Sequence, residues 1–304
     1  MTVLRLGYVH LAVTDMAEAH NHYAEVVGLA KSQHTADHIY LKGWDEWDHH
    51  SLVLEEGDGG LTAMGWKVSD VDALGKVEQA AQRFGATVRR ISHGERTAVG
   101  DGFRCELPSG HVAEFYSEIE VVGTEVGTLN PDPWPRKGLR GVGAPRLSHL
   151  ALSCDDVAGM ERFMVEVCGF HATERIVADP ENPEPIASFM SCGEQAHDIA
   201  IQKGEDGRLH HIAYQVESWN DVLHAADVLS MNDVPIDIGP TRHGITRGET
   251  VYFFDPTGNR NEVFAGGYRS GPDMPCITWT LDQMARAIFY HDRRLSEQFL
   301  TAMT

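Results

Sequence analysis

The sequence predicts an α+β fold in which a unit of one strand, one helix and further strands occurs four times. Two internal repeats support this prediction. Residues 8–29 resemble residues 147–170, and residues 64–86 resemble residues 212–234. Each segment has an alternating apolar pattern, then a helix-capping residue, then apolar positions at helical spacing. Two copies of the unit therefore lie in each half of the chain.

Each half is also predicted to end in a β-hairpin. The sequence CELPSGHVAEFY (105–116) parallels FFDPTGNRNEVF (253–264). Pro-Ser-Gly and Pro-Thr-Gly separate two β runs in these segments, which is a turn signal. Gly28 and Gly169 follow the first helix of each half and are expected to end it.

A proline-rich segment separates the two halves. NPDPWPRKG (130–138) contains three prolines and is typical of a linker. We therefore predict two similar domains, residues 1–135 and residues 136–304. Apolar residues near helical spacing predict a further helix at the C-terminus, within residues 281–300.

The composition is that of a globular protein that binds neither nucleic acid nor membranes. Of the 304 residues, 42% are hydrophobic, and the formal net charge of −20 would be repelled by phosphate backbones and anionic lipids. No apolar run approaches the roughly 18 residues of a membrane helix, and no signal peptide is recognisable.

The five cysteines lack a C-x-x-C pattern, which favours free thiols. We expect a cytoplasmic location.

Two histidines and a glutamate in the second half form a candidate metal site. His149 and His211 lie in separate predicted strands, and Glu262 lies in the second strand of the last hairpin. Two imidazoles and one carboxylate suit an octahedral divalent ion with open coordination positions, as in non-heme Fe(II) oxygenases. The residual positive charge on such an ion favours an anionic chelating substrate.

The first half has only part of this set. His10 corresponds in sequence to His149, and Glu114 corresponds to Glu262. Counting back from Glu114 by the spacing between His211 and Glu262 leads to Ala63. The first half is therefore predicted to bind no metal at the matching position.

Strand parity favours His211 over its neighbour His210 as the ligand. Alternate residues of a strand face opposite sides. In HLALS, His149 shares a face with small residues, and in HIAYQ His211 does the same. His210 would break this match, so we expect it to lie beside the site.

The segment TRHGITRGETVYFFDPTGNRNE (241–262) resembles the signature of type I extradiol ring-cleavage dioxygenases. These enzymes belong to the vicinal oxygen chelate superfamily, and their βαβββ modules match the four units described above. The resemblance extends over nearly the whole chain, including HDRRL near the C-terminus, and is closest to catechol 2,3-dioxygenases. It implies four βαβββ modules, with the metal only in the C-terminal domain.

The resemblance also implies which residues bind the metal. His149, His211 and Glu262 match the Fe(II) ligands of the family. Mn(II) uses the same three ligands, so the sequence leaves both ions open.

Three further residues match residues that act on the substrate in this family. His197, in QAHDIAI, matches a histidine that assists oxygen activation and proton transfer. His243, in TRHG, matches a histidine that hydrogen-bonds the substrate. Tyr252, in TVYFF, matches a tyrosine near the catecholate hydroxyl. Without the resemblance, His197 could simply end a strand and Tyr252 could belong to the core.

The implied reaction is cleavage of catechol or an alkylcatechol by O2, beside the diol, to a 2-hydroxymuconic semialdehyde. The alternative within the family is a 2,3-dihydroxybiphenyl-type enzyme for bulkier diols. Two alternative functions are compatible with the same fold: a glyoxalase-type isomerase and a non-catalytic binding protein. The first needs a fourth protein ligand, and the second usually lacks the metal set. The family also implies a homo-oligomer, a tetramer.

Several histidines in the first half are spaced as closely in the sequence as metal ligands can be, but they have no obvious set of partner ligands. We expect them to be surface or interface residues: His20, His22, His34, His38, His49 and His50.

Overall fold

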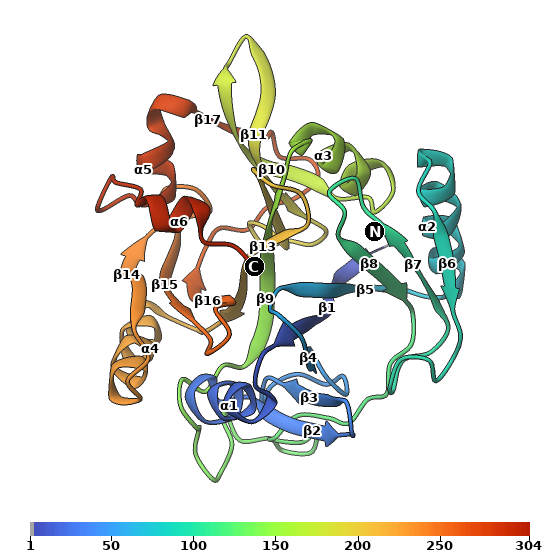
Figure 1. Cartoon of the computed structure of the whole chain (residues 1–304), viewed down its shortest axis with the longest axis vertical. Helices are drawn as coiled ribbons and strands as arrows, with labels where there is room; N and C mark the ends of the chain where they lie inside the picture. The colour runs from blue at the N-terminus through green and yellow to red at the C-terminus, as the bar shows by residue number, and fades with distance from the viewer. Residues whose placement is uncertain (1–2) are drawn as a thin grey trace.

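The computed structural model describes residues 3–304, which form four consecutive βαβββ modules (Figure 1). The first two modules lie in the first half of the chain. Their elements are β1 (Val3–Val13), α1 (Met16–Asn21), the π-helical η1 (His22–Val27), β2 (Ala30–His34), β3 (His38–Lys42), β4 (Leu52–Glu56), β5 (Leu61–Val68), α2 (Val71–Phe84), β6 (Val88–Ile91), β7 (Gly102–Glu106) and β8 (Val112–Tyr116).

The second half repeats this order and adds a C-terminal extension. Its modules contain β9 (Arg146–Cys154), α3 (Val157–Glu166), β10 (His171–Asp179), β11 (Asn182–Ser191), β12 (Ile199–Lys203), β13 (Arg208–Gln215), α4 (Trp219–Met231), β14 (Ile236–Arg242), β15 (Gly248–Phe254) and β16 (Arg260–Gly266). The extension contains β17 (Ile277–Thr280), the 3₁₀-helical η2 (Leu281–Gln283), α5 (Met284–Ile288) and α6 (Glu297–Thr301).

Each half forms one mixed β-sheet. The first has eight strands in the order β2-β3-β4-β1-β5-β8-β7-β6, and the second has nine in the order β14-β15-β16-β13-β9-β12-β11-β10-β17. The first strands of paired modules are antiparallel neighbours at the centre of each sheet, β1 with β5 and β9 with β13. The predicted α+β class and the fourfold unit are confirmed.

The C-terminal extension differs from the single helix expected over residues 281–300. Short helices begin at Leu281, Met284 and Glu297, and an irregular turn separates the last two. The break brings the rings of Phe289 and Phe299 to 4.8 Å between centroids. In a continuous helix, ten residues would separate their Cα atoms by about 15 Å along the axis. Packing of these two aromatic rings therefore explains the break.

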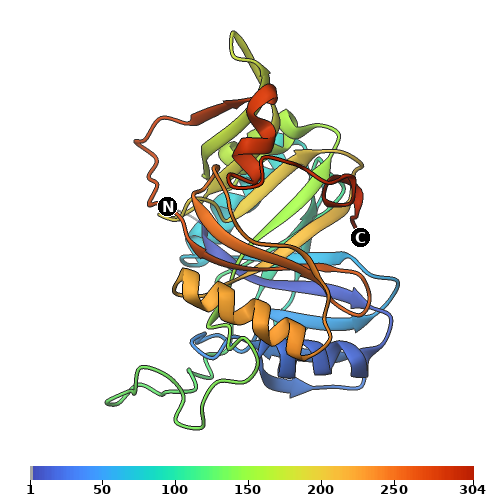
Figure 2. The same cartoon turned by 90° about the vertical axis from the view of Figure 1, so that its left-hand side faces the viewer.

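The apolar faces of the two halves form one continuous core. The ring of Trp66 on β5 meets Phe170 of the second half edge-on at 5.2 Å, and Phe84 of α2 meets Phe163 of α3 at 5.1 Å. The longer helices lie around the outside of the sheets in Figures 1 and 2. None of the helices in residues 3–304 is long and apolar enough to span a membrane. All five cysteines are free thiols.

Residues 117–145 connect the first sheet to the second along the chain. In this described segment there is no helix and no strand longer than a single bridge. It is drawn in green and loops out at the lower left of Figure 2. The expected linker lies in this segment, and so does the boundary between residues 135 and 136. That boundary stays a prediction, because the two halves share their core.

Asn259, in the turn between β15 and β16, ties the two halves together. Its side-chain oxygen accepts a hydrogen bond from the Gly60 amide at 2.7 Å, and its Nδ2 donates to the Ala12 carbonyl at 3.1 Å. Nδ2 also donates to Asp255, whose carboxylate accepts from the hydroxyl of Tyr23 in the first half at 2.9 Å. Asn259 is fully buried, so water cannot replace these partners.

We therefore expect Asn259→Ala to lower the free energy of unfolding by about 3 kcal/mol, because buried polar groups lose their partners. Urea unfolding followed by circular dichroism would measure the change. Asn220→Ala, at an exposed position of α4, is the matched control and should change stability by less than about 0.5 kcal/mol. Equal stability of the two variants would contradict the role given to Asn259.

Candidate metal centre

Three neighbouring strands place a metal-ligating set on one face of the second sheet. His149 on β9 lies opposite Ala213 on β13, and Ala213 lies opposite Glu262 on β16. Directly opposite residues in a sheet point to the same face. His211 is two residues before Ala213 and shares that face. Because Ala213 carries only a methyl group, space remains above it where the other three side chains meet.

The ligand atoms of His149, His211 and Glu262 converge on one point. His149 Nε2 lies 3.0 Å and His211 Nε2 lies 3.1 Å from the same carboxylate oxygen, Glu262 Oε2. His211 Nε2 is buried and has no hydrogen-bond partner, although the carboxylate oxygen lies this close. With metal–ligand bonds of about 2.1 Å at right angles, ligands lie about 3.0 Å apart. The three side chains therefore fit a divalent ion.

The charge of Glu262 suits this role. Burial alone would raise the pKa of this carboxyl group, but its contacts with His149 and His211 hold the pKa well below the usual value. The carboxylate is therefore ionised, as a metal ligand must be.

Neighbouring hydroxyl groups orient two of these side chains. The Ser148 hydroxyl lies 3.1 Å from Nδ1 of His149, and the Thr250 hydroxyl donates to Oε1 of Glu262. Each contact leaves the other ligand atom, His149 Nε2 or Glu262 Oε2, facing the centre. Neither Ser148 nor Thr250 carries a sequence signal, because serine and threonine are common in strands and only the register brings them here.

His210 lies behind His211 and not in the cluster. The Nδ1 atoms of the two rings are 2.7 Å apart, and His210 Nε2 lies 2.9 Å from the carbonyl oxygen of Phe299. When His211 Nε2 binds a metal, its Nδ1 carries the proton and donates to His210 Nδ1. His210 must then carry its proton on Nε2, where the Phe299 carbonyl accepts it. The structure thus places His211 in the cluster and His210 beside it, as strand parity predicts.

We expect His211→Ala to abolish stoichiometric metal binding and turnover, because a coordinating atom is removed. His210→Ala should retain metal with an affinity about 10- to 100-fold weaker, because only the group that orients His211 is lost. Metal content measured after equilibrium dialysis would separate the two variants. Metal retained in His211→Ala but absent from His210→Ala would reverse the assignment.

His243 and Tyr252 lie together on the β14–β15 side of the cluster. The Tyr252 hydroxyl is 3.0 Å from His243 Nε2, and His243 Nδ1 contacts the carbonyl of Ile288 on α5. A carbonyl only accepts, so Nδ1 carries the proton and Tyr252 donates to Nε2. His243 Nε2 is also 3.5 Å from Oε1 of Glu262, which places this pair next to the cluster.

His197 lies on the opposite side, just before β12. Its ring centroid is 4.0 Å from that of His149 and 5.4 Å from that of Phe189. Burial, followed by the neighbouring His149, lowers its pKa well below the usual value. All six residues singled out from the sequence therefore line one cavity.

That cavity has a volume of about 360 Å³, and its wall is mostly apolar. No sequence pattern indicates the wall, because ordinary aliphatic and aromatic residues form most of it, from β10, β11, the turn after β14 and the C-terminal extension. They are Ile176, Ile186, Ala187, Phe189, Ile245, Leu281, Met284, Ile288, Phe299 and Leu300, and Ala151, Ala200, Ile201 and Phe264 complete the apolar lining.

The first half differs from the second more than the sequence comparison indicates. Gly65 lies opposite Glu114, as Ala213 lies opposite Glu262, but the residue opposite Gly65 on β1 is Tyr8 and not His10. A Cβ atom on Gly65 would lie 2.4 Å from the Tyr8 ring, so the glycine makes room for it. His10 is displaced two residues along β1, about 7 Å. The predicted match of His10 with His149 therefore holds in sequence but not in position.

Arginine side chains surround Glu114. Arg96 and Arg104 each reach its Oε1 at 2.6 Å, and the Tyr8 hydroxyl donates to Oε2 at 2.7 Å. Burial alone would raise the pKa of Glu114, but the Arg96 guanidinium holds it below the usual value. Two guanidinium groups thus compensate the negative charge of the Glu114 carboxylate.

The expectation that the first-half histidines are surface or interface residues is partly wrong. His49 and His50 are buried with their Nδ1 atoms 3.0 Å apart, because the turn before β4 folds them inward. His22 is buried where the two halves meet, with its ring 5.7 Å from Phe253. His34 is exposed, and His20 is partly exposed.

Comparisons with known proteins agree with this architecture. The family model described as Glyoxalase/Bleomycin resistance protein/Dioxygenase superfamily matches residues 146–263, and the model described as Catechol 2,3-dioxygenase-like N-terminal domain matches residues 61–120. Metapyrocatechase from Pseudomonas sp. (strain CF600) is 42% identical over 306 residues, covering 99% of each chain. The manganese-dependent 2,3-dihydroxybiphenyl 1,2-dioxygenase of Geobacillus genomosp. 3 is 27% identical over 95% of this chain and 94% of that protein. These matches place the chain in the dioxygenase class of this superfamily.

Similar solved structures indicate which kind of dioxygenase the chain resembles. The 2,3-dioxygenase LapB from Pseudomonas sp. KL28 has a TM-score of 0.90 and 39% identity, covering 93% of this chain and 99% of that one. Homoprotocatechuate 2,3-dioxygenase from Brevibacterium fuscum, in complex with 3,4-dihydroxyphenylacetate, has a TM-score of 0.89 and 29% identity, covering 99% of this chain and 92% of that one. The chain belongs to the extradiol dioxygenases.

Proposed function

We propose that this protein cleaves catechol and alkylcatechols with O2 beside the diol, giving 2-hydroxymuconic semialdehydes that retain both oxygen atoms of O2. The observation that carries the proposal is the convergence of His149, His211 and Glu262 at the base of an apolar cavity. The full-length relative at 42% identity, named metapyrocatechase, supports the catechol substrate.

We propose Fe(II) as the bound ion, held by the same three side chains. Such an ion supplies a redox-active Lewis acid that binds a chelating diol and activates O2. The relative named as manganese-dependent makes Mn(II) the alternative, and metal analysis of the purified protein decides between them.

The remaining polar residues of the cavity divide between the two sides of the cluster. Tyr252 and His243, joined at 3.0 Å, are placed to bind a diol oxygen and to hold its proton. His197, beside His149 on the other side, is placed to donate a hydrogen bond to oxygen as its negative charge grows. Phe189, Ile288 and Phe299 give the wall beside these polar groups an apolar surface.

The test is an anaerobic purification followed by metal analysis, then addition of catechol and air. The proposal predicts about one iron per chain and a yellow ring-fission product. Iron without a product from any diol would contradict the reaction. Neither metal nor product after anaerobic addition of Fe(II) would favour a non-catalytic binding protein.

His197→Gln should lower kcat by about 100-fold or more while the iron content stays unchanged, because general acid–base groups contribute on that order. His224→Gln, at an exposed position of α4, is the matched control and should behave as the wild type. Steady-state oxygen uptake together with iron analysis would test this. Wild-type kcat in His197→Gln would remove the residue from the mechanism.

The apolar wall predicts a preference among ring substituents. Each methylene buried against it contributes about 0.8 kcal/mol, so kcat/KM should rise up to about fourfold from catechol to 4-methylcatechol. The carboxylate of 3,4-dihydroxyphenylacetate should lower it, because Lys203 of the wall already pairs with Asp155 at 2.7 Å. Measured kcat/KM values would test the order. The highest value for 2,3-dihydroxybiphenyl would instead select the bulky-diol alternative.

We also propose a homotetramer, on family membership. Light scattering coupled to gel filtration would test it, and a monomer would contradict it. The cytoplasmic location expected from the sequence stays a prediction.

A further inference from the structure

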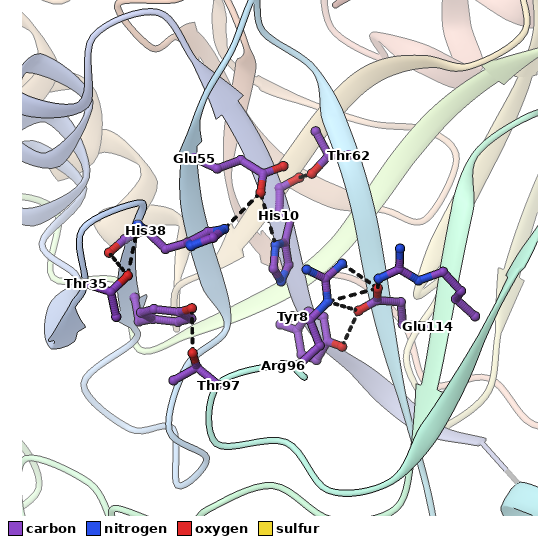
Figure 3. A network of polar contacts seen from close by, with 11 residues as sticks. Tyr8, His10, Thr35, His38, Glu55, Thr62, Arg96, Thr97 and Glu114 are labelled. Carbon is purple, nitrogen blue, oxygen red and sulfur yellow. Dashed lines mark hydrogen bonds and ion pairs between the residues drawn. The ribbon is translucent and has the colours of Figure 1, made fainter. Parts of the chain in front are cut away.

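We propose that the first half of the chain contains a second, separate site for a divalent cation of the Zn²⁺ type, formed by His10, His38 and Glu55. These side chains come from β1, β3 and β4 and point toward one another in Figure 3. The site shares no residue with the His149 cluster and does not use Glu114.

The strand register places all three side chains on one face of the first sheet. His38 on β3 lies directly opposite Glu55 on β4. His10 on β1 lies opposite Val53, two residues before Glu55 and therefore on the same face. The displacement on β1 described above therefore separates His10 from Glu114 and brings it to His38 and Glu55.

The distances and the burial fit a metal better than a hydrogen-bonded network. Glu55 Oε2 lies 3.2 Å from His38 Nε2 and 3.8 Å from His10 Nδ1. The second distance is too long for a hydrogen bond, and His10 Nδ1 has no partner although His10 is only 3% exposed. Tetrahedral ligands on bonds of about 2.0 Å lie about 3.3 Å apart. Shifts of a few tenths of an ångström would therefore bring Glu55 and His10 into coordination.

The surroundings also permit a cation. Arg96 lines the adjoining cavity, but its guanidinium is held by Glu114 and so points at that carboxylate (Figure 3). A small cavity of about 120 Å³ adjoins the cluster and gives room for a water molecule as fourth ligand. The side chains of His38 and Glu55 are 29% and 24% exposed, so an ion can enter from solvent.

The donor set favours Zn²⁺ or a similar borderline ion over Ca²⁺ or Mg²⁺. Two imidazoles and one carboxylate are typical zinc ligands, whereas Ca²⁺ and Mg²⁺ prefer oxygen ligands. The ion would join three strands of the first module. Its expected effect is therefore on stability and not on the diol-binding cavity.

The experiment uses the iron-loaded protein, incubated anaerobically with ZnSO₄, freed of unbound metal on a desalting column and analysed for iron and zinc. We compare wild type, His38→Ala, Glu55→Gln and the control His34→Ala, which alters an exposed histidine on the neighbouring strand. Wild type and His34→Ala should hold one iron and one zinc per chain. His38→Ala and Glu55→Gln should keep the iron and bind zinc at least about tenfold more weakly.

A second measurement guards against variants that are merely poorly folded. Zinc should raise the Tm of iron-loaded wild type and of His34→Ala, because a ligand that binds only the folded state stabilises it. It should not raise the Tm of His38→Ala or Glu55→Gln. Zinc that enters only as iron leaves would overturn the proposal. So would zinc binding that is equal in His38→Ala, Glu55→Gln and wild type.

Discussion

The site depends on one row of three residues across neighbouring strands. His149, Ala213 and Glu262 lie opposite one another on β9, β13 and β16, and His211 follows from the same register. A slip of one residue in any of these pairings would turn a ligand to the other face of the sheet. The continuous core beneath the sheet and the buried turn at Asn259 hold this register. Packing of the whole domain is therefore what sets distances of 3.0 and 3.1 Å at Glu262.

The two halves show how one module takes on two roles. The same sheet order surrounds Glu114 and Glu262, yet Glu114 is bound by Arg96 and Arg104, whereas Glu262 faces two imidazoles. A two-residue offset of β1 separates these outcomes, because it places Tyr8 where the second half has His149. The offset carries His10 to a new set of neighbours. A change of register, and not only loss of a ligand, thus distinguishes the halves.

Much of the fold and of the candidate site could be predicted from the sequence. Repeats and Pro-x-Gly turns predict the four modules, and the face shared by His149 and His211 predicts the cluster, because strand alternation is a local property. The cavity wall, Ser148 and Thr250 could not be predicted, since only long-range pairing brings them together. The offset of β1 depends on long-range pairing as well, so no sequence pattern places His38 and Glu55 beside His10. The break at Phe289 depends on tertiary aromatic packing.

The most direct test of the central claim is anomalous diffraction at the iron absorption edge from crystals of the iron-loaded protein. The account predicts a strong peak between His149 Nε2, His211 Nε2 and Glu262 Oε2, above Ala213. A peak centred on His210, or an iron peak in the first half with none at Glu262, would contradict it.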